Sequence, residues 1–372
     1  MVNRARRSPE PLTYPSPNFR DTLCLNQGTP FASIGRVSLF RKGSVLFIAL
    51  WSLCLLSIFA VYLGYGVRQK ITLAKRLSSR GNLRLIAEAG VKRAIAELIK
   101  KEEPTGYDAL NETWSSNPGA FKQVSVGSGE FDVCYDYFDY QSGKLQTRYG
   151  LIDEERKLNI NVEDLNTIQR LITAVTVLGG TDAQNLAAAI VDWRDSDSAL
   201  SVPSGSAEDI YYRSLSVPYE AKDADYEVLD ELLLVRGMNQ KILDKLKNYI
   251  SIHSSGKINI NTVSVEVLRA MDLGEELIDK ILSFRRGKDG TEATEDDNIF
   301  DSPSKIIEEL NSFSELSESE TLKLNSLIPS GKISTDSANF TVRSIAYLDG
   351  QESEIVCVVN REGNILSWYR KV

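Results

Sequence analysis

The sequence predicts an α+β fold in which a long N-terminal helix precedes an antiparallel β-sheet, and a large α-helical domain is inserted into that sheet. Three observations predict it. An apolar run from Ser44 to Val67 continues without proline into a helix-compatible stretch that reaches Lys101. Aromatic and β-branched residues are frequent in two blocks, 131–155 and 339–372. The residues between these blocks are mostly helical in pattern and contain an internal repeat.

Composition and motif content exclude several kinds of function. The 372 residues carry a formal net charge of −8, so the chain has no overall basic field for nucleic acid. The single histidine, His253, argues against histidine-ligated zinc and against histidine-based acid–base catalysis. The sequence has no Gly-x-Ser-x-Gly elbow, no phosphate-binding P-loop and no His-Glu-x-x-His motif. We therefore predict that the protein is not an enzyme.

The apolar run from Ser44 to Val67 is predicted to be a retained transmembrane segment. At about 1.5 Å per residue, its 24 residues can cross the roughly 30 Å hydrocarbon core of a bilayer. Arg41 and Lys42 favour a cytoplasmic N-terminus, and no Ala-x-Ala-like cleavage site follows the run. The residues directly before it, Arg-Lys-Gly, resemble the end of a type IV prepilin leader, which a prepilin peptidase cleaves after the glycine.

That resemblance implies that residues 1–43 are a cytoplasmic leader, that cleavage follows Gly43, and that Ser44 becomes a methylated N-terminus. Residues 68–103 are predicted to continue as an amphipathic helix, because apolar residues recur mostly at spacings near three and four. A membrane helix that continues in this way has the form of a pilin spine. An ordinary single-pass protein with a helical stalk is the alternative. The apolar positions are Val67, Ile71, Ala74, Leu77, Ile86, Ala89, Ile95 and Leu98.

The predicted sheet has two parts, residues 104–156 and 331–372. In the first, a turn-rich stretch precedes two strands, FDVCYDYFDY and KLQTRYGLIDEE, joined around Gln141-Ser142-Gly143. In the second, turns at Asp349-Gly350 and Glu362-Gly363-Asn364 divide the sequence into three strands. Cys134 and Cys357 then lie in strands of one sheet and could form a disulfide outside the cytoplasm; two buried free thiols are the alternative.

The inserted helical domain, residues 157–330, contains the repeat. KLNINVEDL begins at Lys157 and KININTVSV begins at Lys257, and each precedes a predicted helical hairpin. Asn161 and Thr262 are predicted to cap the first helix of each hairpin. A third hairpin turns at Gly237. The three together are typical of helix-hairpin-helix repeats.

Such hairpins often bind the phosphate backbone of DNA at a Gly-x-Gly turn. None of the three turns contains Gly-x-Gly. Acidic residues surround the last turn, and they would repel a phosphate. We therefore expect a structural use of the hairpins, with DNA binding as the alternative. The acidic residues are Asp272, Glu275, Glu276 and Asp279.

Two acidic loops are candidate metal sites. The first, VDWRDSDSALSVPSGSAEDIYYRSL, clusters carboxylates on a loop rich in Pro, Gly and Ser, which suits the 6–8 oxygen ligands of Ca²⁺. It lacks the Gly and Glu of an EF-hand. The second is RRGKDGTEATEDDNIFDSPSKI. The alternatives are a solvated acidic loop and an exposed turn before a helix capped by Ser302 or Ser304. The acids are Asp192, Asp195, Asp197, Glu208 and Asp209 in the first loop, and Asp289, Glu292, Glu295, Asp296, Asp297 and Asp301 in the second, where Asp289, Asp296 and Asp297 are the candidate ligands.

The order of these motifs resembles protein K of the type II, or general, secretion pathway, which is the large minor pseudopilin. The similarity covers roughly residues 41–328, and its most specific part is Asp-Trp-x-Asp-x-Asp at 192–197 followed by Gly-x-Ala-Glu-Asp-x-Tyr-Tyr at 205–212. The resemblance implies a pilin-like spine helix and sheet with a large inserted α-domain. It also implies calcium in the first acidic loop, with Asp195, Asp197 and Glu208 as the leading ligands and Asp192 and Asp209 next.

The resemblance further implies a minor pseudopilin that caps the tip of the pseudopilus and helps to initiate its assembly for protein export across the outer membrane. The implied partners are minor pseudopilins of the I and J types, the major pseudopilin, prepilin peptidase, the inner membrane and secreted proteins, but not nucleic acid. The implied location is the bacterial inner membrane, with a single pass and a periplasmic C-terminal domain. The alternatives are a membrane-anchored DNA-binding or uptake protein and a minor pilin of a related type IV pilus-like system.

Ile48 agrees with a place at the tip. Counted from Ser44 it occupies mature position five, where major pilins carry a glutamate that neutralises the amino terminus of a neighbouring subunit within the membrane. A subunit with no neighbour ahead of it has no amine to neutralise, so an apolar residue avoids an unpaired carboxylate. The alternative is that Ile48 belongs to an ordinary anchor.

Overall fold

A computed structural model of the chain describes residues 44–100, 106–139, 143–203 and 205–371, so the predicted leader, residues 1–43, lies outside the described residues. Helix α1 spans Ser44–Ile99, 56 residues, and it ends slightly before the predicted boundary at residue 103. In the described part of the chain, α1 is the one helix that is long and apolar enough to cross a membrane. The predicted long N-terminal helix is therefore present.

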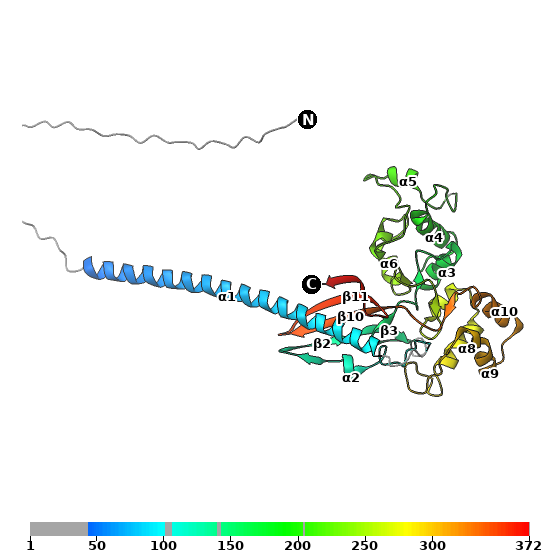
Figure 1. The fold of residues 1–372 in the computed structure, drawn as a ribbon. Helices are drawn as coiled ribbons and strands as arrows, with labels where there is room; N and C mark the ends of the chain where they lie inside the picture. Colours follow the sequence, from blue (N-terminus) through cyan, green and yellow to red (C-terminus); the bar gives the residue numbers. More distant parts are fainter. Residues whose placement is uncertain (1–43, 101–105, 140–142, 204, 372) are drawn as a thin grey trace, which may run out of the picture. The chain divides into compact units, whose positions relative to one another are not determined.

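The C-terminal part of α1 lies against the sheet (Figure 1). Leu83, Ile86 and Leu98 are buried in one core with residues of the strands. A methyl group at Gly90 would collide with the side chains of Ser344 and Phe131, so this glycine permits the close approach of helix and sheet. The predicted continuation of the helix is present, but only part of its apolar stripe meets the sheet: Ile71 and Leu77 are each 61% exposed, and buried residues begin near Ser79.

The main sheet has six antiparallel strands in the order β1-β2-β10-β11-β12, with β5 also paired to β10. The three predicted C-terminal strands are confirmed, and the turn at Asp349-Gly350 has φ values of 51° and 73°, as a two-residue type I′ hairpin requires. The sheet combines strands from both sides of the helical domain. They are β1 (Val124–Val126), β2 (Gly129–Val133), β5 (Ile152–Asp153), β10 (Asn339–Leu348), β11 (Gln351–Asn360) and β12 (Ile365–Lys371).

The segment predicted as two strands in the first part of the sheet forms four. FDVCYDYFDY breaks at Cys134, and its second half is β3 (Tyr135–Asp139), which pairs with β4 (Lys144–Arg148) in a separate hairpin. KLQTRYGLIDEE likewise divides into β4 and β5. The turn-rich stretch before them also holds a short helix, α2 (Pro118–Phe121), which Asn117 caps by accepting a hydrogen bond from the Ala120 N–H.

The possible disulfide is not formed in this structure, in which Cys134 and Cys357 are free buried thiols, as in the alternative. Cys134 follows β2 and donates its N–H to Arg343 of β10, whereas Cys357 of β11 pairs with Val342 on the other side of β10. Two strand spacings, roughly 9–10 Å, exceed the ~7 Å between Cα atoms that a disulfide spans. Burial raises the pKa of both thiols, that of Cys357 to about 12.

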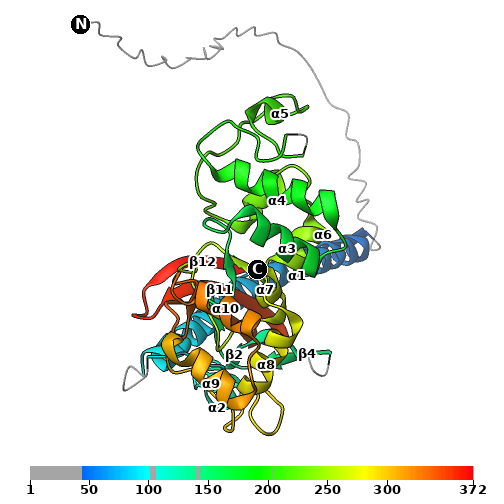
Figure 2. The ribbon, with the colours of Figure 1, turned by 90° about the vertical axis from the view of Figure 1, so that its right-hand side faces the viewer.

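The residues between β5 and β10 form a helical domain with a second core, in which the two repeats have parallel architectures. Each repeat opens with a two-residue strand and a helical hairpin, continues through an acidic loop and further helices, and closes with a strand parallel to the first. Figure 2 shows the helices of the two repeats. The first repeat comprises β6 (Leu158–Asn159), α3 (Leu165–Val175), α4 (Gly180–Arg194), α5 (Asp209–Arg213), η1 (Leu229–Leu234), α6 (Gln240–Leu246) and β7 (Ile250–Ser251). The second comprises β8 (Ile258–Asn259), α7 (Val265–Ala270), α8 (Glu275–Arg285), η2 (Pro303–Lys305), α9 (Ile306–Phe313), α10 (Glu318–Leu327) and β9 (Ile333–Ser334).

The predicted capping residues are wrong, because the helices begin two to three residues later. Asp164 caps α3 by accepting from the Thr167 N–H, and Ser264 is the residue before α7. The Asn161 side chain instead exchanges two hydrogen bonds with the backbone of Tyr226. Asn261, at the equivalent position, does the same with Phe300. The asparagines therefore tie the start of each repeat to a distant loop of the same repeat.

An acidic triplet, Asp153-Glu154-Glu155, joins the sheet to the helical domain. Asp153 accepts hydrogen bonds from Thr262, Ser337 and Asn259. Glu155 accepts from the N–H groups of Ser255 and Asn339. Because the triplet is almost fully buried, its hydrogen bonds offset the cost of removing carboxylates from water.

Candidate metal centre

The first acidic loop leaves the C-terminal end of α4, and it brings together three of the five predicted ligands. Asp195 directly follows the helix, Asp197 lies two residues further along, and Glu208 precedes α5. One carboxylate oxygen from each of these residues lies within 4.8 Å of the others. A single ion could therefore contact all three side chains.

Buried oxygens without a hydrogen-bond partner mark this cluster. They are Asp192 Oδ2, Asp195 Oδ1 and Glu208 Oε1. Glu208 is only 5% exposed and Asp192 is fully buried. A buried carboxylate oxygen without a donor is costly, so the arrangement calls for a positive group that the chain itself does not supply.

The pKa values of the clustered carboxyl groups also indicate that a positive group is missing. Burial, followed by the charges of Asp192 and Asp195, raises the pKa of Glu208 to about 7. Burial and the charges of Asp197 and Asp192 also raise the pKa of Asp195. Like charges held this close disfavour their own ionisation, and a divalent cation would reverse that effect.

Aromatic rings pack against one another at both ends of this loop. Two of them, Trp193 and Tyr212, belong to the motif that resembles protein K. The Trp193 and Tyr212 rings meet edge to face with centroids 5.1 Å apart, and Tyr212 stacks on Tyr219 at 5.2 Å. Arg236 donates from Nη1 to the carbonyl oxygen of Ser206 within the loop. These contacts fix both ends of a loop that has few apolar residues of its own.

The other two predicted ligands have different roles. Asp192 lies near the cluster, but its Oδ1 accepts from the Ser201 N–H. Asp209 is turned away, because it pairs with Arg213 at 2.8 Å and accepts from the Ala221 N–H. The sequence prediction missed Asp223, whose charge acts on Glu208, and Asn185, whose Oδ1 is buried without a partner. Asp223 belongs to an acidic stretch, Asp223-Ala-Asp, that could have drawn attention to it.

The second acidic loop does not assemble a comparable cluster in the described residues. Asp296 Oδ2 accepts from the N–H groups of Lys288 and Asp289, and Asp297 Oδ2 accepts from Ala293. Asp289 accepts from the Thr291 N–H. The loop thus satisfies its candidate ligands internally, which agrees with the alternative of an acidic turn. Neither Ser302 nor Ser304 caps the next helix through its side chain, because their hydroxyls bond to each other.

The donor set at the first loop fits a hard divalent cation. Asp195, Asp197 and Glu208 supply only oxygen, and no nitrogen or sulfur ligand takes part in the cluster. Calcium takes 6–8 oxygens in flexible geometry, and loop carbonyls and water can supply those beyond the carboxylates. Magnesium demands a stricter octahedron, and zinc favours nitrogen or sulfur. The residues therefore fit calcium best.

Acidic residues surround the α7–α8 turn, as the sequence indicated. At the α7–α8 turn, Asp272 pairs with Lys323 at 3.0 Å and Glu275 pairs with Arg269 at 2.7 Å. Lys247, directly after α6, pairs with Asp244 of that helix. Acidic side chains therefore stand where a phosphate would approach.

Comparison with known proteins agrees with the fold and the loop. The family model for the type II secretion system (T2SS), protein K, matches residues 148–255, which include Asp195, Asp197 and Glu208. Residues 148–255 are therefore similar to the protein K family of the type II secretion system. A curated relative, type II secretion system protein K of Aeromonas hydrophila, is 40% identical over 87 residues. That alignment covers 23% of this chain, and the chain spans about a quarter, 26%, of the relative's length.

The structural likeness extends beyond the protein K domain. A chain in the crystal structure of the GspK-GspI-GspJ complex from the enterotoxigenic Escherichia coli type 2 secretion system superposes with a TM-score of 0.57. The match covers 80% of this chain and 99% of the other, at 17% identity. At that identity the likeness shows a shared fold of helices and antiparallel sheet.

Proposed function

We propose that this protein is a minor pseudopilin of a type II secretion system, which caps the tip of the pseudopilus and helps to initiate its assembly. The observation that carries the proposal is the protein K domain at residues 148–255, placed between the strands of a sheet that packs on helix α1. A pilin-like core that carries so large an insertion is suited to the end of a filament, because along the shaft the insertion would meet neighbouring subunits.

The proposed partners are minor pseudopilins of the I and J types, together with the major pseudopilin. The structural neighbour was crystallised in the GspK-GspI-GspJ complex, which supports this choice. Exposed apolar side chains cover α1 over the segment from Val45 to Val67. Such a surface suits a bilayer first and the helices of other subunits after extraction from it.

The proposed location is the bacterial inner membrane, with a single pass and the C-terminal domain in the periplasm. The run that begins at Ser44 supports the single pass, and Arg41 with Lys42 supports the orientation. We place the protein in a structural rather than an enzymatic class, since its domain family is a component of the secretion apparatus. Its paired helices would then serve packing, as helix-hairpin-helix units without a nucleic-acid site.

We also propose that Asp195, Asp197 and Glu208 hold one calcium ion. The unpartnered buried oxygens of the cluster support it. Bound calcium would neutralise the three carboxylates and fix the loop between α4 and α5. The ion would have a structural role there.

Processing by prepilin peptidase is the decisive test of the function. The protein isolated from membranes should begin at Ser44 with a methylated amine, as measured by intact mass and N-terminal sequencing. Gly43→Asp should keep the full leader, whereas Gly64→Ala, within the apolar run, should be cleaved as the parent is. An intact leader in the parent, in a host with an active prepilin peptidase, would contradict the pseudopilin assignment.

A further inference from the structure

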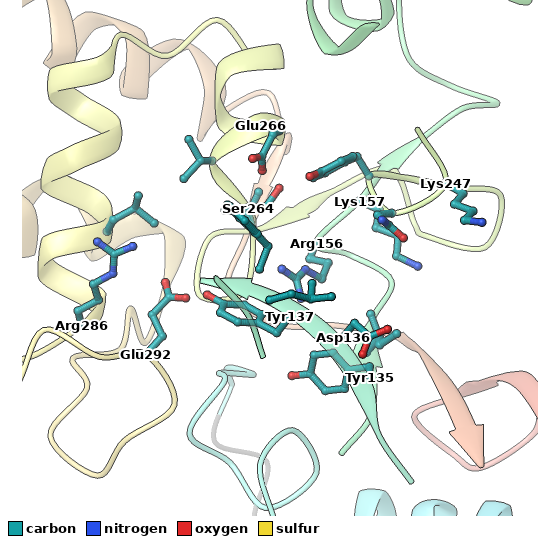
Figure 3. Close-up of a pocket in the computed structure, with 18 residues that line it drawn as sticks. Tyr135, Asp136, Tyr137, Arg156, Lys157, Lys247, Ser264, Glu266, Arg286 and Glu292 are labelled. Atoms are coloured by element: carbon teal, nitrogen blue, oxygen red, sulfur yellow. The ribbon is translucent and has the colours of Figure 1, made fainter. Parts of the chain in front are cut away.

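A cavity of about 370 Å³ lies between strand β3 and the helical domain (Figure 3). Four successive residues of β3, 135–138, line one side, and Tyr249, Ser264 and Glu266 are among those that line the other. Side chains on one face of a strand come from every second residue. A cavity that touches four in succession therefore reaches the edge of the strand.

The edge of β3 at this cavity is unpaired in the described part of the chain, where β3 pairs only with β4. The Gly150 N–H donates to Val133, and the register then places the hydrogen-bonded pairs at Tyr135 and Tyr137. The N–H and C=O groups of Asp136 and Phe138 consequently point to the opposite edge. Cys134 donates its N–H to Arg343 on that same edge, which confirms the direction.

Arg156 supplies an uncompensated charge to the same cavity. Figure 3 shows its guanidinium beside the Tyr137 ring, with the centroid 5.7 Å away. Among the described residues, no carboxylate lies within 4.0 Å of it, and it donates no hydrogen bond within the chain. Burial lowers the pKa of Arg156. Arg156 is partly exposed, and a guanidinium without an acceptor in the chain is free to bind an incoming anion from that side.

Most other charges in the lining are already balanced. Lys157 pairs with Glu154, Lys247 with Asp244, and Glu292 with Arg285. Asp136 lies 3.8 Å from Arg343. Arg343 also pairs with Glu354 at 3.0 Å, so Asp136 is only partly neutralised. Among the described lining residues, Arg156 and Arg286 are the cations without an ion pair within 4.0 Å, and an added carboxylate is therefore favoured on the Arg156 side of the cavity.

We propose that this cavity binds an extended peptide segment of another protein, with its backbone along the free edge of β3 and a carboxylate at Arg156. Strand addition satisfies the N–H and C=O groups of Asp136 and Phe138, and the guanidinium selects an acidic segment. Tyr137, Phe138 and Leu145 supply apolar contact for the side chains of the segment. The binding needs no leader cleavage, so an uncleaved N-terminus would contradict the proposed function and leave this site in place.

The test uses the full chain in neutral detergent micelles and two peptide amides, acetyl-Val-Thr-Val-Asp-Val-Thr-Val and its Asn counterpart. Calorimetric titration should give a Kd for the Asp peptide at least about tenfold lower than for the Asn peptide, as expected for one charge-assisted contact. Arg156→Gln should abolish that difference. Equal affinities of the two peptides in the parent, or no binding of either at about 1 mM, would overturn the proposal.

A pair of variants at one exposed position distinguishes a change in peptide binding from a loss of folding. Leu145 lines the cavity and is 67% exposed, so either charge is tolerated there. Leu145→Glu should raise the Kd of the Asp peptide by about tenfold, because the new carboxylate repels the peptide's own. Leu145→Lys should bind the Asp peptide with a Kd equal to that of the parent or lower. Equal effects of the two substitutions would contradict a carboxylate at Arg156. Displacement of the Asp peptide by inorganic phosphate at equal concentration would assign the cavity to free anions and also overturn the peptide site.

Discussion

Arg194 and Arg285 hold equivalent backbone carbonyls in the two repeats of the helical domain. Arg194 donates to Ile160 and Glu163, and Arg285 donates to Ile260 and Val263, the two sets lying 100 residues apart in the sequence. Each arginine ends the second helix of its hairpin. The same contact therefore anchors the start of both acidic loops, although only the first gathers carboxylates into a cluster.

Calcium is expected to stabilise the parent protein through that cluster. At 100 times its Kd, a ligand that binds only the folded state adds about 2.7 kcal/mol. In thermal unfolding, the parent should melt at a higher temperature in calcium than in chelator, and Asp197→Ala with Glu208→Ala should show no such difference. Asp182→Asn, an exposed acid at the start of α4, should respond as the parent does. Equal melting of parent and double variant in both buffers would remove the metal site.

The paired hydrogen bonds that Asn161 makes to Tyr226, and Asn261 to Phe300, should each contribute to stability. Asn261→Ala leaves the buried backbone N–H and C=O of Phe300 without partners, so we expect a loss of about 2–3 kcal/mol in the free energy of unfolding. Asn161→Ala should cost somewhat less, since its site is partly exposed. Urea titration measures both. Asn325→Ala, exposed on α10, should change stability by less than about 0.5 kcal/mol, and a similar effect there would disprove a specific role of these hydrogen bonds.

Two glycines of α1 should respond in opposite directions to alanine. Gly90→Ala places a methyl group against Ser344 and Phe131, and should destabilise the protein by about 1–3 kcal/mol. Gly81→Ala meets nothing within 4 Å and removes an unfavourable helical glycine, so it should stabilise by about 0.5–1 kcal/mol. Denaturant unfolding compares the two variants. A neutral Gly90→Ala would show that the helix can withdraw from the sheet at little cost.

The acidic triplet Asp153-Glu154-Glu155 should make the stability of the protein depend on pH. Burial and the charge of Asp153 raise the pKa of Glu155 from 4.5 to about 8. Between these values the folded protein holds a proton that the unfolded chain releases, so this contribution to stability is full below about pH 4.5 and is lost as pH rises towards 8.

Glu155→Gln should flatten that part of the stability curve, measured by denaturant unfolding from pH 5 to 8. It should also cost about 1 kcal/mol at pH 5, because an amide nitrogen cannot accept from the N–H of Ser255 or Asn339. Glu362→Gln, an exposed acid, should keep the slope of the parent. An unchanged slope in Glu155→Gln would assign the pH dependence to other groups.

The sequence predicted those parts of the fold that local chemistry specifies. The hairpin at Asp349-Gly350 was predictable because few residues accept two successive positive φ values. The carboxylates at Asp195, Asp197 and Glu208 were predictable because they recur on one loop and match a specific motif. The role of Asp209 was not, because its carboxylate is taken by Arg213, one turn further along the same face of α5, and by the N–H of Ala221 from a separate segment.

Other features depended on contacts between distant segments. Asn161 looked like a cap because asparagine is a good one, yet its partner is Tyr226, 65 residues away. The spacing of apolar residues could not show that Ile71 and Leu77 stay exposed, since that depends on where the sheet begins to cover α1. The order of strands that separates Cys134 from Cys357 is likewise a property of the whole sheet.

The hydrogen bond between Asp153 and Ser337, 2.8 Å long, joins residues 184 positions apart at the two ends of the helical domain. A domain whose ends meet in this way can grow, shrink or be exchanged without altering the register of β5 and β10 beside it. The geometry of the sheet and of the part of α1 that it covers is accordingly independent of how large the helical domain is.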